Sequence, residues 1–209
     1  QGRIPVAISV AGGHIVGSPF TVSVVAGPVS LSQTLLTGTG AQDRTAGDPA
    51  TLIVQSRDAY ANALTSSAPG ALTVSLAASA SLSVSCRDTA PSLTCDYLLT
   101  ISGSYSQQVT LNGAVSTATS TFKVFPNIVS AATMTTSGNG LTAATAGTAA
   151  SFTLTSRDKY GNQVTLGRTP FTATLGGVIL GSSVSVKSSV VDLNNGQYYV
   201  SYVATVTGT

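Results

Sequence analysis

Apolar and polar residues alternate along much of the chain in short runs. In the run 50–55 every even-numbered position is apolar, and the run 150–154 shows the same phase. Such a period of two turns one face of a strand toward a core and the other toward solvent. Clusters of Gly, Asn, Asp, Pro and Ser separate the runs at intervals of about 8–12 residues, which is the strand spacing of a sandwich. The pattern predicts an all-β protein made of short strands.

The sequence also repeats itself at an offset of 100 residues. Across the 18 positions from Thr45 to Asn62, nine residues are identical to those from Thr145 to Asn162. Two glycines of the middle copy, Gly38 and Gly40, recur in the same way. A period near 100 residues is too long for a solenoid and matches one immunoglobulin-like sandwich. We therefore expect tandem immunoglobulin-like β-sandwich domains.

The repeat predicts three segments. Residues 1–28 match 104–124 as a hairpin, and we expect them to be the last two strands, F and G, of a preceding repeat. Residues 29–126 are expected to form one complete repeat. Residues 127–209 are expected to form a repeat that lacks its last strands. The chain is thus interpreted as an interior piece of a longer array, and no signal peptide is visible at its start.

Four short motifs resemble filamin-type immunoglobulin-like repeats. In chain order they are Gly17-Ser18-Pro19-Phe20, Ser102-Gly103-Ser104-Tyr105, Arg157-Asp158-Lys159-Tyr160-Gly161-Asn162 and Asn195-Gly196-Gln197-Tyr198-Tyr199-Val200-Ser201-Tyr202. Their order and spacing cover nearly the whole chain. The resemblance implies filamin-type β-sandwich domains in a divergent, non-muscle member of the family.

The middle copy departs from the family pattern in three places. Ala61 replaces the turn glycine, Ser120-Thr121-Phe122 stands for Ser-Pro-Phe, and Thr94-Cys95-Asp96-Tyr97 stands for Asp-Gly-x-Tyr. Bacterial invasin-type repeats carry a similar Asp-x-x-Gly-Asn turn and are the alternative family. They do not usually show the Ser-Pro-Phe and Tyr-x-Val-x-Tyr pair, so the filamin-type interpretation is preferred.

The amino-acid composition argues against several classes of function. Charged residues make up only 8% of the chain and there is no Glu, whereas soluble domains average about 25% charged residues. No Lys/Arg cluster exists that could neutralise several phosphates, so we expect no nucleic-acid partner. No apolar stretch approaches the roughly 18 residues that span a bilayer, so no membrane insertion is expected in this part of the protein.

The residues required for common catalytic mechanisms are missing. His14 is the only histidine, no carboxylate pair or Gly-x-Ser-x-Gly elbow is present, and no phosphate-binding loop follows the paired glycines. A single imidazole without a nearby partner is neither a metal site nor a general base. We therefore predict no enzyme activity, no cofactor and no metal site.

One turn recurs in both copies and is the strongest candidate for a specific structural role. An Asp that leaves a strand accepts backbone N–H groups and fixes the turn, Asn does the same work, and we expect the intervening Tyr to cover the end of the core. Calcium binding is the alternative, but it needs about six to eight oxygen ligands. The residues are Asp58, Tyr60 and Asn62 in the middle copy and Asp158, Tyr160, Gly161 and Asn162 in the last copy.

Cys86 and Cys95 are the only cysteines. The residues between them read as a turn between consecutive strands, and antiparallel neighbours bring Cβ atoms to about 4–5.5 Å, within reach of a disulfide. Two free buried thiols are the alternative. A disulfide favours an oxidising compartment.

Three functional interpretations follow, of which the last is a module appended to an enzyme whose catalytic part lies elsewhere in the parent chain. The first is a non-catalytic module of an extracellular or cell-surface protein, with O-glycosylation of its many Ser and Thr residues, protein partners or neighbouring repeats, and a homo-oligomeric or fibrous assembly. The second is an intracellular cytoskeletal or ciliary scaffold. The filamin resemblance implies for it that partner peptides add as strands in the groove between strands C and D. The expected edge residues are Ala71, Thr73, Ser75, Thr172 and Thr174.

Overall fold

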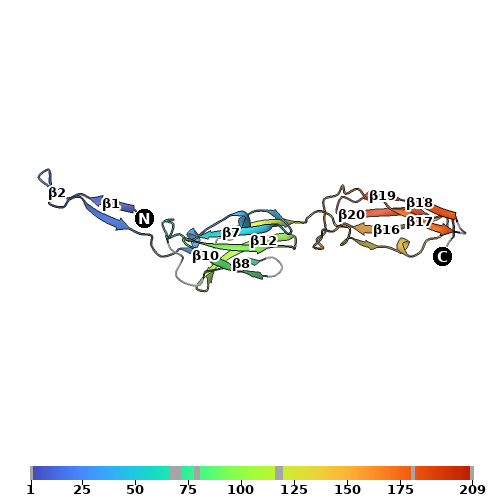
Figure 1. Ribbon diagram of the computed structural model, residues 1–209, viewed down its shortest axis with the longest axis horizontal. Coiled ribbons are helices and arrows are strands. Elements are labelled where there is room, and N and C mark those ends of the chain that lie inside the picture. The colour runs from blue at the N-terminus through green and yellow to red at the C-terminus, as the bar shows by residue number, and fades with distance from the viewer. Residues whose placement is uncertain (1, 66–71, 78–80, 116–119, 180–181, 208–209) are drawn as a thin grey trace. The chain divides into compact units, whose positions relative to one another are not determined.

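The computed structural model describes residues 2–65, 72–77, 81–115, 120–179 and 182–207, and these residues form strands and short 3-10 helices (Figure 1). Within these ranges no helix has the length and apolar character needed to cross a bilayer. Backbone contacts group the chain into two units. The first comprises Gln1–Asp43, Pro49–Leu98 and Ser104–Lys123, and the second comprises Arg44–Asp48, Leu99–Gly103 and Val124–Thr209.

The first element of the first unit is a hairpin. Strand β1 (Gly2–Val6) pairs antiparallel with β4 (Phe20–Val24), and β2 (Ser9–Val10) pairs with β3 (Gly13–His14) nearer the turn. The cross-strand pairs Ile4–Val22 and Val6–Phe20 share one face, because paired residues of antiparallel strands point the same way. The other face carries Arg3–Ser23 and Pro5–Thr21. The hairpin therefore has one apolar and one mainly polar face.

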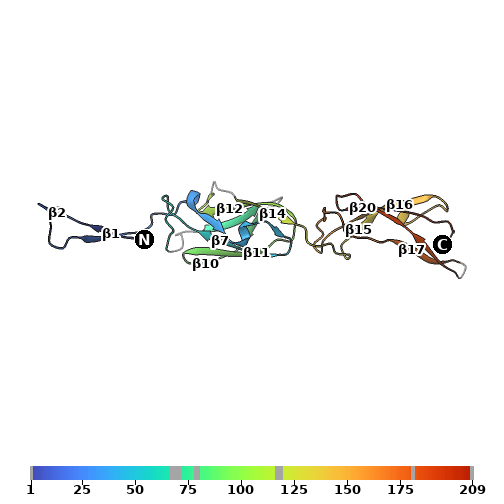
Figure 2. The same ribbon diagram turned by 90° about the horizontal axis from the view of Figure 1, so that it is seen from above.

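The middle repeat is a sandwich of two sheets (Figures 1 and 2). Its first sheet has the order β10-β11-β7-β5, and its second has the order β6-β14-β12-β8-β9, with the short β13 paired to the end of β12. The strands are β5 (Leu35–Thr37), β6 (Arg44–Thr45), β7 (Pro49–Gln55), β8 (Leu72–Ala77), β9 (Ser81–Val84), β10 (Cys86–Thr89), β11 (Ser92–Leu98), β12 (Gly103–Leu111), β13 (Ala114–Val115) and β14 (Ser120–Phe125). The 3-10 helices η1 (Leu31–Gln33) and η2 (Thr39–Ala41) flank β5.

The core of this repeat lies between the two sheets. Leu52 and Val54 of β7 meet Val74 of β8 and Val109 of β12, together with Cys95 of β11. These side chains are almost completely buried. In the second sheet the rings of Tyr105 and Phe122 stack with their centroids 5.6 Å apart. The alternation of the sequence thus marks the buried face of each strand.

The recurring glycines allow the chain to cross close above this core. Gly38 has a φ of +90°, a region that favours glycine. A Cβ on Gly40 would lie 2.7 Å from the Cβ of Leu52, and one on Gly140 would lie 2.7 Å from the backbone nitrogen of Ser151. Any larger residue would push η2, or the 3-10 helix η3 (Asn139–Leu141) of the last repeat, away from the strand beneath it.

The last repeat lies in the second unit and has one sheet of the same kind. Its order is β15-β16-β20-β19, and a separate two-stranded sheet is formed by β17 and β18. Tyr198, Val200 and Tyr202 of β20 are buried, and the Tyr198 ring meets that of Phe171 edge-on at 4.4 Å. The elements are β15 (Thr135–Ser137), η3 (Asn139–Leu141), β16 (Ala149–Thr155), β17 (Thr174–Ile179), β18 (Ser182–Lys187), β19 (Ser189–Asp192) and β20 (Gln197–Val203).

The two repeats differ in how well β7 and its counterpart β16 are covered. Leu52 is fully buried, whereas Phe152 at the equivalent position is half-buried. In the described part of the last repeat the second sheet contains β17 and β18 alone. The facing layer is therefore much narrower than the one built around β12 and β14.

Truncating Leu52 should destabilise the middle repeat strongly. Leu52→Ala removes a fully buried side chain and should lower the free energy of unfolding by about 2–5 kcal/mol. Ile53→Ala, on the partly exposed neighbouring position, is the matched control and should cost clearly less. Denaturant unfolding of the purified chain measures both, and equal losses would contradict the assigned strand phase.

Candidate functional site

The Asp58 carboxylate is the centre of the recurring turn. Its Oδ1 accepts the backbone N–H groups of Tyr60 and Asn62, each at 2.9 Å. Its Oδ2 accepts the Asn62 side-chain amide and the backbone N–H of Gly27, again at 2.9 Å. Gly27 lies 31 residues upstream, immediately before the middle repeat. The carboxylate therefore fixes the turn and also holds the chain that enters the repeat.

Asp158 repeats this arrangement in the second unit. Its Oδ1 accepts the backbone N–H groups of Tyr160 and Asn162, and its Oδ2 accepts the Asn162 amide and the backbone N–H of Asn127. The Asn127 amide in turn donates to the carbonyl of Ala46. The contact with the incoming chain is not visible in the sequence, because Gly27 and Asn127 are different residues and the backbone N–H makes the bond.

Hydrogen bonding keeps both carboxylates ionised. The Asn62 side chain, followed by the N–H of Gly27, lowers the pKa of Asp58 from its ordinary value of 3.8 to about 2. At Asp158 burial acts in the opposite direction, but the hydrogen bonds from Asn162, Asn127 and Tyr160 outweigh it and lower the pKa. A carboxylate that accepts four donors from its own chain is saturated, so the geometry favours the structural role over calcium binding.

The expectation that the turn tyrosine covers the end of the core is wrong for Tyr60. Tyr60 is almost fully exposed. Tyr160 lies against Gly47, where an added Cβ would come within 2.1 Å of its hydroxyl, and the ammonium of Lys159 sits 4.9 Å from its ring centroid. Tyr160 is half-buried, and at both turns the buried side chain is the aspartate, Asp58 or Asp158.

Asn162 has an additional role within the second unit. Its amide donates to the carbonyl of Thr100, and its Oδ1 accepts the backbone N–H of Ser102 at 2.8 Å. The segment Leu99–Gly103 belongs to the same unit. One turn therefore organises three separate stretches of backbone around Asp158 and Asn162.

The stability of the middle repeat should depend on the ionisation of Asp58. Because the folded-state pKa is depressed, the carboxylate contributes stability above about pH 4 that is lost as the pH falls toward about 2. Asp58→Asn should lower stability at neutral pH and flatten this acid limb. Urea unfolding between neutral pH and pH 2 measures the effect. Asp88→Asn, at an exposed position of β10, is the control, and an equally flattened limb in this variant would contradict the assignment.

The two cysteines form the expected disulfide. Cys86 of β10 and Cys95 of β11 are directly opposite in the antiparallel register, and their Cα atoms are 4.1 Å apart. Beside the bridge, the exposed pair Arg87 and Asp96 forms an ion pair, and the hydroxyl of Thr51 donates to Asp96 at 2.7 Å. The Thr51 hydrogen bond and then Arg87 lower the pKa of Asp96. The bridge joins neighbouring strands of one sheet, and its Cys95 end lies in the core.

Loss of this disulfide should reduce stability by a moderate amount. The bridged residues are nine apart, and the chain-entropy model gives about 2–3 kcal/mol for so short a loop. Chemical unfolding with and without reductant measures the difference. The double variant Cys86→Ala/Cys95→Ala should be insensitive to reductant, and a wild-type chain that is equally insensitive would contradict a formed bridge.

The expected strand-addition residues are not equivalent in the structure. Strand β8 pairs with β12 on one side and β9 on the other, so Thr73 and Ser75 lie inside the sheet and not on a free edge. Thr172 precedes β17, and Thr174 begins it. Ala71 lies outside the described residues. The strand β8 is therefore flanked by β12 as well as β9, so the middle repeat leaves no free edge on this strand within the described residues.

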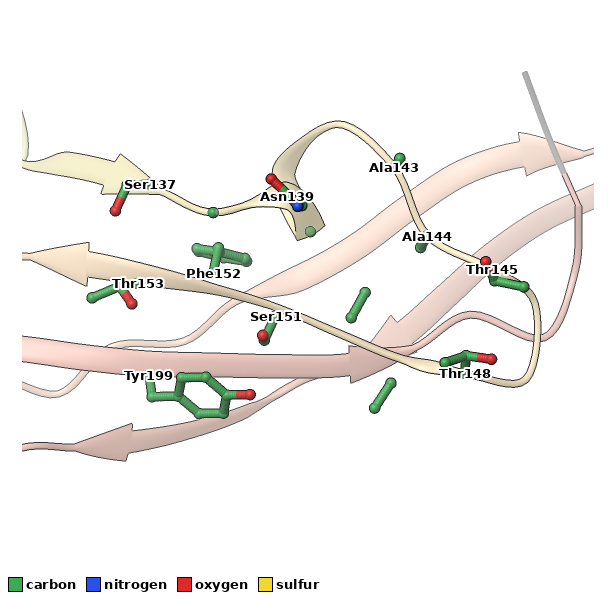
Figure 3. A pocket seen from close by; sticks show the side chains of 14 residues that line it. Ser137, Asn139, Ala143, Ala144, Thr145, Thr148, Ser151, Phe152, Thr153 and Tyr199 are labelled. Atoms are coloured by element: carbon green, nitrogen blue, oxygen red, sulfur yellow. The ribbon is translucent and has the colours of Figure 1, made fainter.

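A cavity of about 630 Å³ opens in the last repeat (Figure 3). It is lined by residues 137–140, 143–145 and 148–153, with Tyr199. Hydroxyls, amides and the Phe152 ring surround it, and its lining holds no carboxylate, imidazole, thiol or amine. Across the described residues there is also no cluster of three or more His, Cys, Asp or Glu side chains. The cavity thus has a mixed polar and apolar lining without an acid–base side chain.

The paired sheets and the recurring turn define a protein of tandem immunoglobulin-like domains. Residues 128–209 match the family model of the Filamin/ABP280 repeat. This part of the chain is a filamin-type repeat, as the motifs predicted, and the middle repeat is related to it by the internal offset. No curated protein sequence matches the chain significantly.

Two solved structures resemble most of the chain. The Escherichia coli adhesin FdeC is 21% identical with a TM-score of 0.52, and the match covers 95% of this chain and 64% of that one. Invasin, a bacterial integrin-binding protein, is 14% identical with a TM-score of 0.54, and the match covers 96% and 39%. The chain thus spans less than two thirds of either protein. These similarities confirm the predicted all-β, tandem sandwich fold.

Proposed function

We propose that this chain is a non-catalytic structural and adhesive module of a multi-repeat protein outside the cell or on its surface. It serves there as a spacer, fibril or interaction stalk. The observation that carries the proposal is the Cys86–Cys95 disulfide within a tandem sandwich so poor in charge. Disulfides persist in oxidising compartments and are rare in the cytosol.

The repeated turn supports the spacer role. At Asp58 and at Asp158 the carboxylate binds the backbone just before the repeat, at Gly27 and Asn127. Each repeat is therefore tied to the chain that enters it by a charge-assisted hydrogen bond, which is stronger than a neutral one. A stalk transmits force along the chain from one repeat to the next. A fixed backbone position where each repeat begins is therefore consistent with this role.

Similarity to surface proteins adds support. FdeC is an adhesin and invasin binds integrin, and both share the tandem sandwich architecture of this chain. Integrin binding is a property of invasin and is not assigned to this chain. For this chain we infer only that its stacked sandwiches serve as a surface stalk. Its partners are other protein chains or neighbouring repeats.

The location and the disulfide can be tested together. In its natural cells, an antibody raised against the middle repeat should label intact, unpermeabilised cells. The protein isolated under thiol-blocking conditions should gain the mass of two hydrogens for this bridge on reduction. Free thiols together with a cytosolic fraction would contradict the proposal and favour the alternative of an intracellular cytoskeletal or ciliary scaffold that binds peptides by strand addition.

A further inference from the structure

The Asn162 side chain binds one loop of the second unit through both of its polar atoms. The loop comprises Leu99–Gly103 and leads from β11 into β12. The Asn162 amide donates to the carbonyl of Thr100, and the Asn162 Oδ1 accepts the backbone N–H of Ser102, each at 2.8 Å. The same amide and the Asn162 backbone N–H also donate to Asp158. The turn therefore holds this side chain in the position from which it binds the loop.

The Asn127 side chain binds a second loop of the same unit, Arg44–Asp48. Its amide donates to the carbonyl of Ala46 at 2.8 Å, and its backbone N–H donates to Asp158. Ala46 is fully buried, and a buried carbonyl without a donor is costly. Asn127 therefore supplies this donor and connects the loop directly to the carboxylate at the centre of the turn.

The Tyr160 ring restricts which residue this second loop can carry at position 47. Gly47 has a φ of +88°, a region that favours glycine. An added Cβ would also lie 2.1 Å from the Tyr160 hydroxyl oxygen and 2.6 Å from its Cε2. Any side chain at this position would force the ring to move. The loop therefore presents bare backbone to the ring.

The two loops are also bonded to each other. The N–H of Gly47 donates to the carbonyl of Leu99 at 2.8 Å. The N–H of Ala46 donates to the carbonyl of Phe125, at the end of β14, at 2.8 Å. A displacement of the loop that Asn162 holds is therefore transmitted to the loop that Asn127 holds.

We infer that the turn of the last repeat is a docking surface for these two loops, and that turn and loops open and close as one cooperative element. The surface recognises two carbonyls and one N–H of the loop backbone, and it requires glycine where the ring packs. Its partner is thus a pair of loops defined by backbone conformation, with little dependence on their side chains. The inference rests on the proposed function only in treating a neighbouring repeat as the partner. The surface is formed by Asn127, Asp158, Tyr160 and Asn162.

Amide hydrogen exchange of the full 209-residue chain, followed residue by residue by NMR, tests this cooperativity. Asn162→Ala should make the N–H groups of Ala46 and Gly47 exchange at least about fivefold faster, as expected for the loss of one hydrogen bond. The hydrogen bonds of the Asn162 side chain go to other residues, so this effect requires coupling between the loops. Ser102→Ala keeps the backbone N–H that Asn162 binds and should leave both rates nearly unchanged.

A second control separates coupling from a general loss of stability. Asn62→Ala removes the equivalent amide bond to Asp58 in the turn of the middle repeat. It should change the exchange of Ala46 and Gly47 clearly less than Asn162→Ala does. Amides of the β8–β12 ladder serve as the internal reference for global unfolding in each variant.

The role of the tyrosine is tested from the opposite side of the contact. Gly47→Ala should accelerate exchange of the Ser102 N–H, which lies in the other loop. In a Tyr160→Ala background the collision with the ring is absent and only the strained φ remains. The same glycine substitution should therefore produce a smaller acceleration there. This comparison does not require the Asn162 variant to fold.

Three results would overturn the inference. Asn162→Ala would accelerate only the Ser102 amide, which would mean that the loops open independently. Asn62→Ala would accelerate Ala46 and Gly47 as much as Asn162→Ala does. In the third case, Gly47→Ala would have the same effect with and without Tyr160. The disulfide and the cellular location are unaffected by these outcomes, so failure here is distinct from failure of the surface-module proposal.

Discussion

A β-sheet with one apolar face must bury that face against a second layer, and this constraint organises the whole chain. The middle repeat satisfies it: Leu52 and Val54 of one sheet meet Val74 and Val109 of the other. Among the described residues, β17 and β18 lie opposite the four-stranded sheet of the last repeat. The same physical requirement therefore explains the closed core of the middle repeat.

The recurring aspartate turn solves a different problem, which is how to fix the point where the chain enters a repeat. Asp58 and Asp158 are buried charges in a chain with few charges, and each accepts four hydrogen bonds. Burying a carboxylate is costly unless its oxygens are hydrogen-bonded. At each turn, backbone N–H groups and one Asn side chain supply these hydrogen bonds. The same motif is present in both repeats although the surrounding strands differ in sequence.

The proposed function rests on the sandwich architecture. The lining of the cavity in the last repeat holds hydroxyls and an aromatic ring and no acid–base side chain. The disulfide, the low charge and the stacked sandwiches support a role as a surface stalk.

The strand phase and the offset of 100 residues can be read from the sequence alone, and the Cys86–Cys95 disulfide was predicted from it with two free thiols as the alternative, because each depends on residues close together or on a simple period. It could not place Tyr60, which is exposed, or Thr73 and Ser75, which lie between two strands. It also could not show that the Asp58 carboxylate holds a backbone N–H 31 residues away. A period of two shows that a strand has a buried face, but which strands lie beside it is decided only when distant segments pack together.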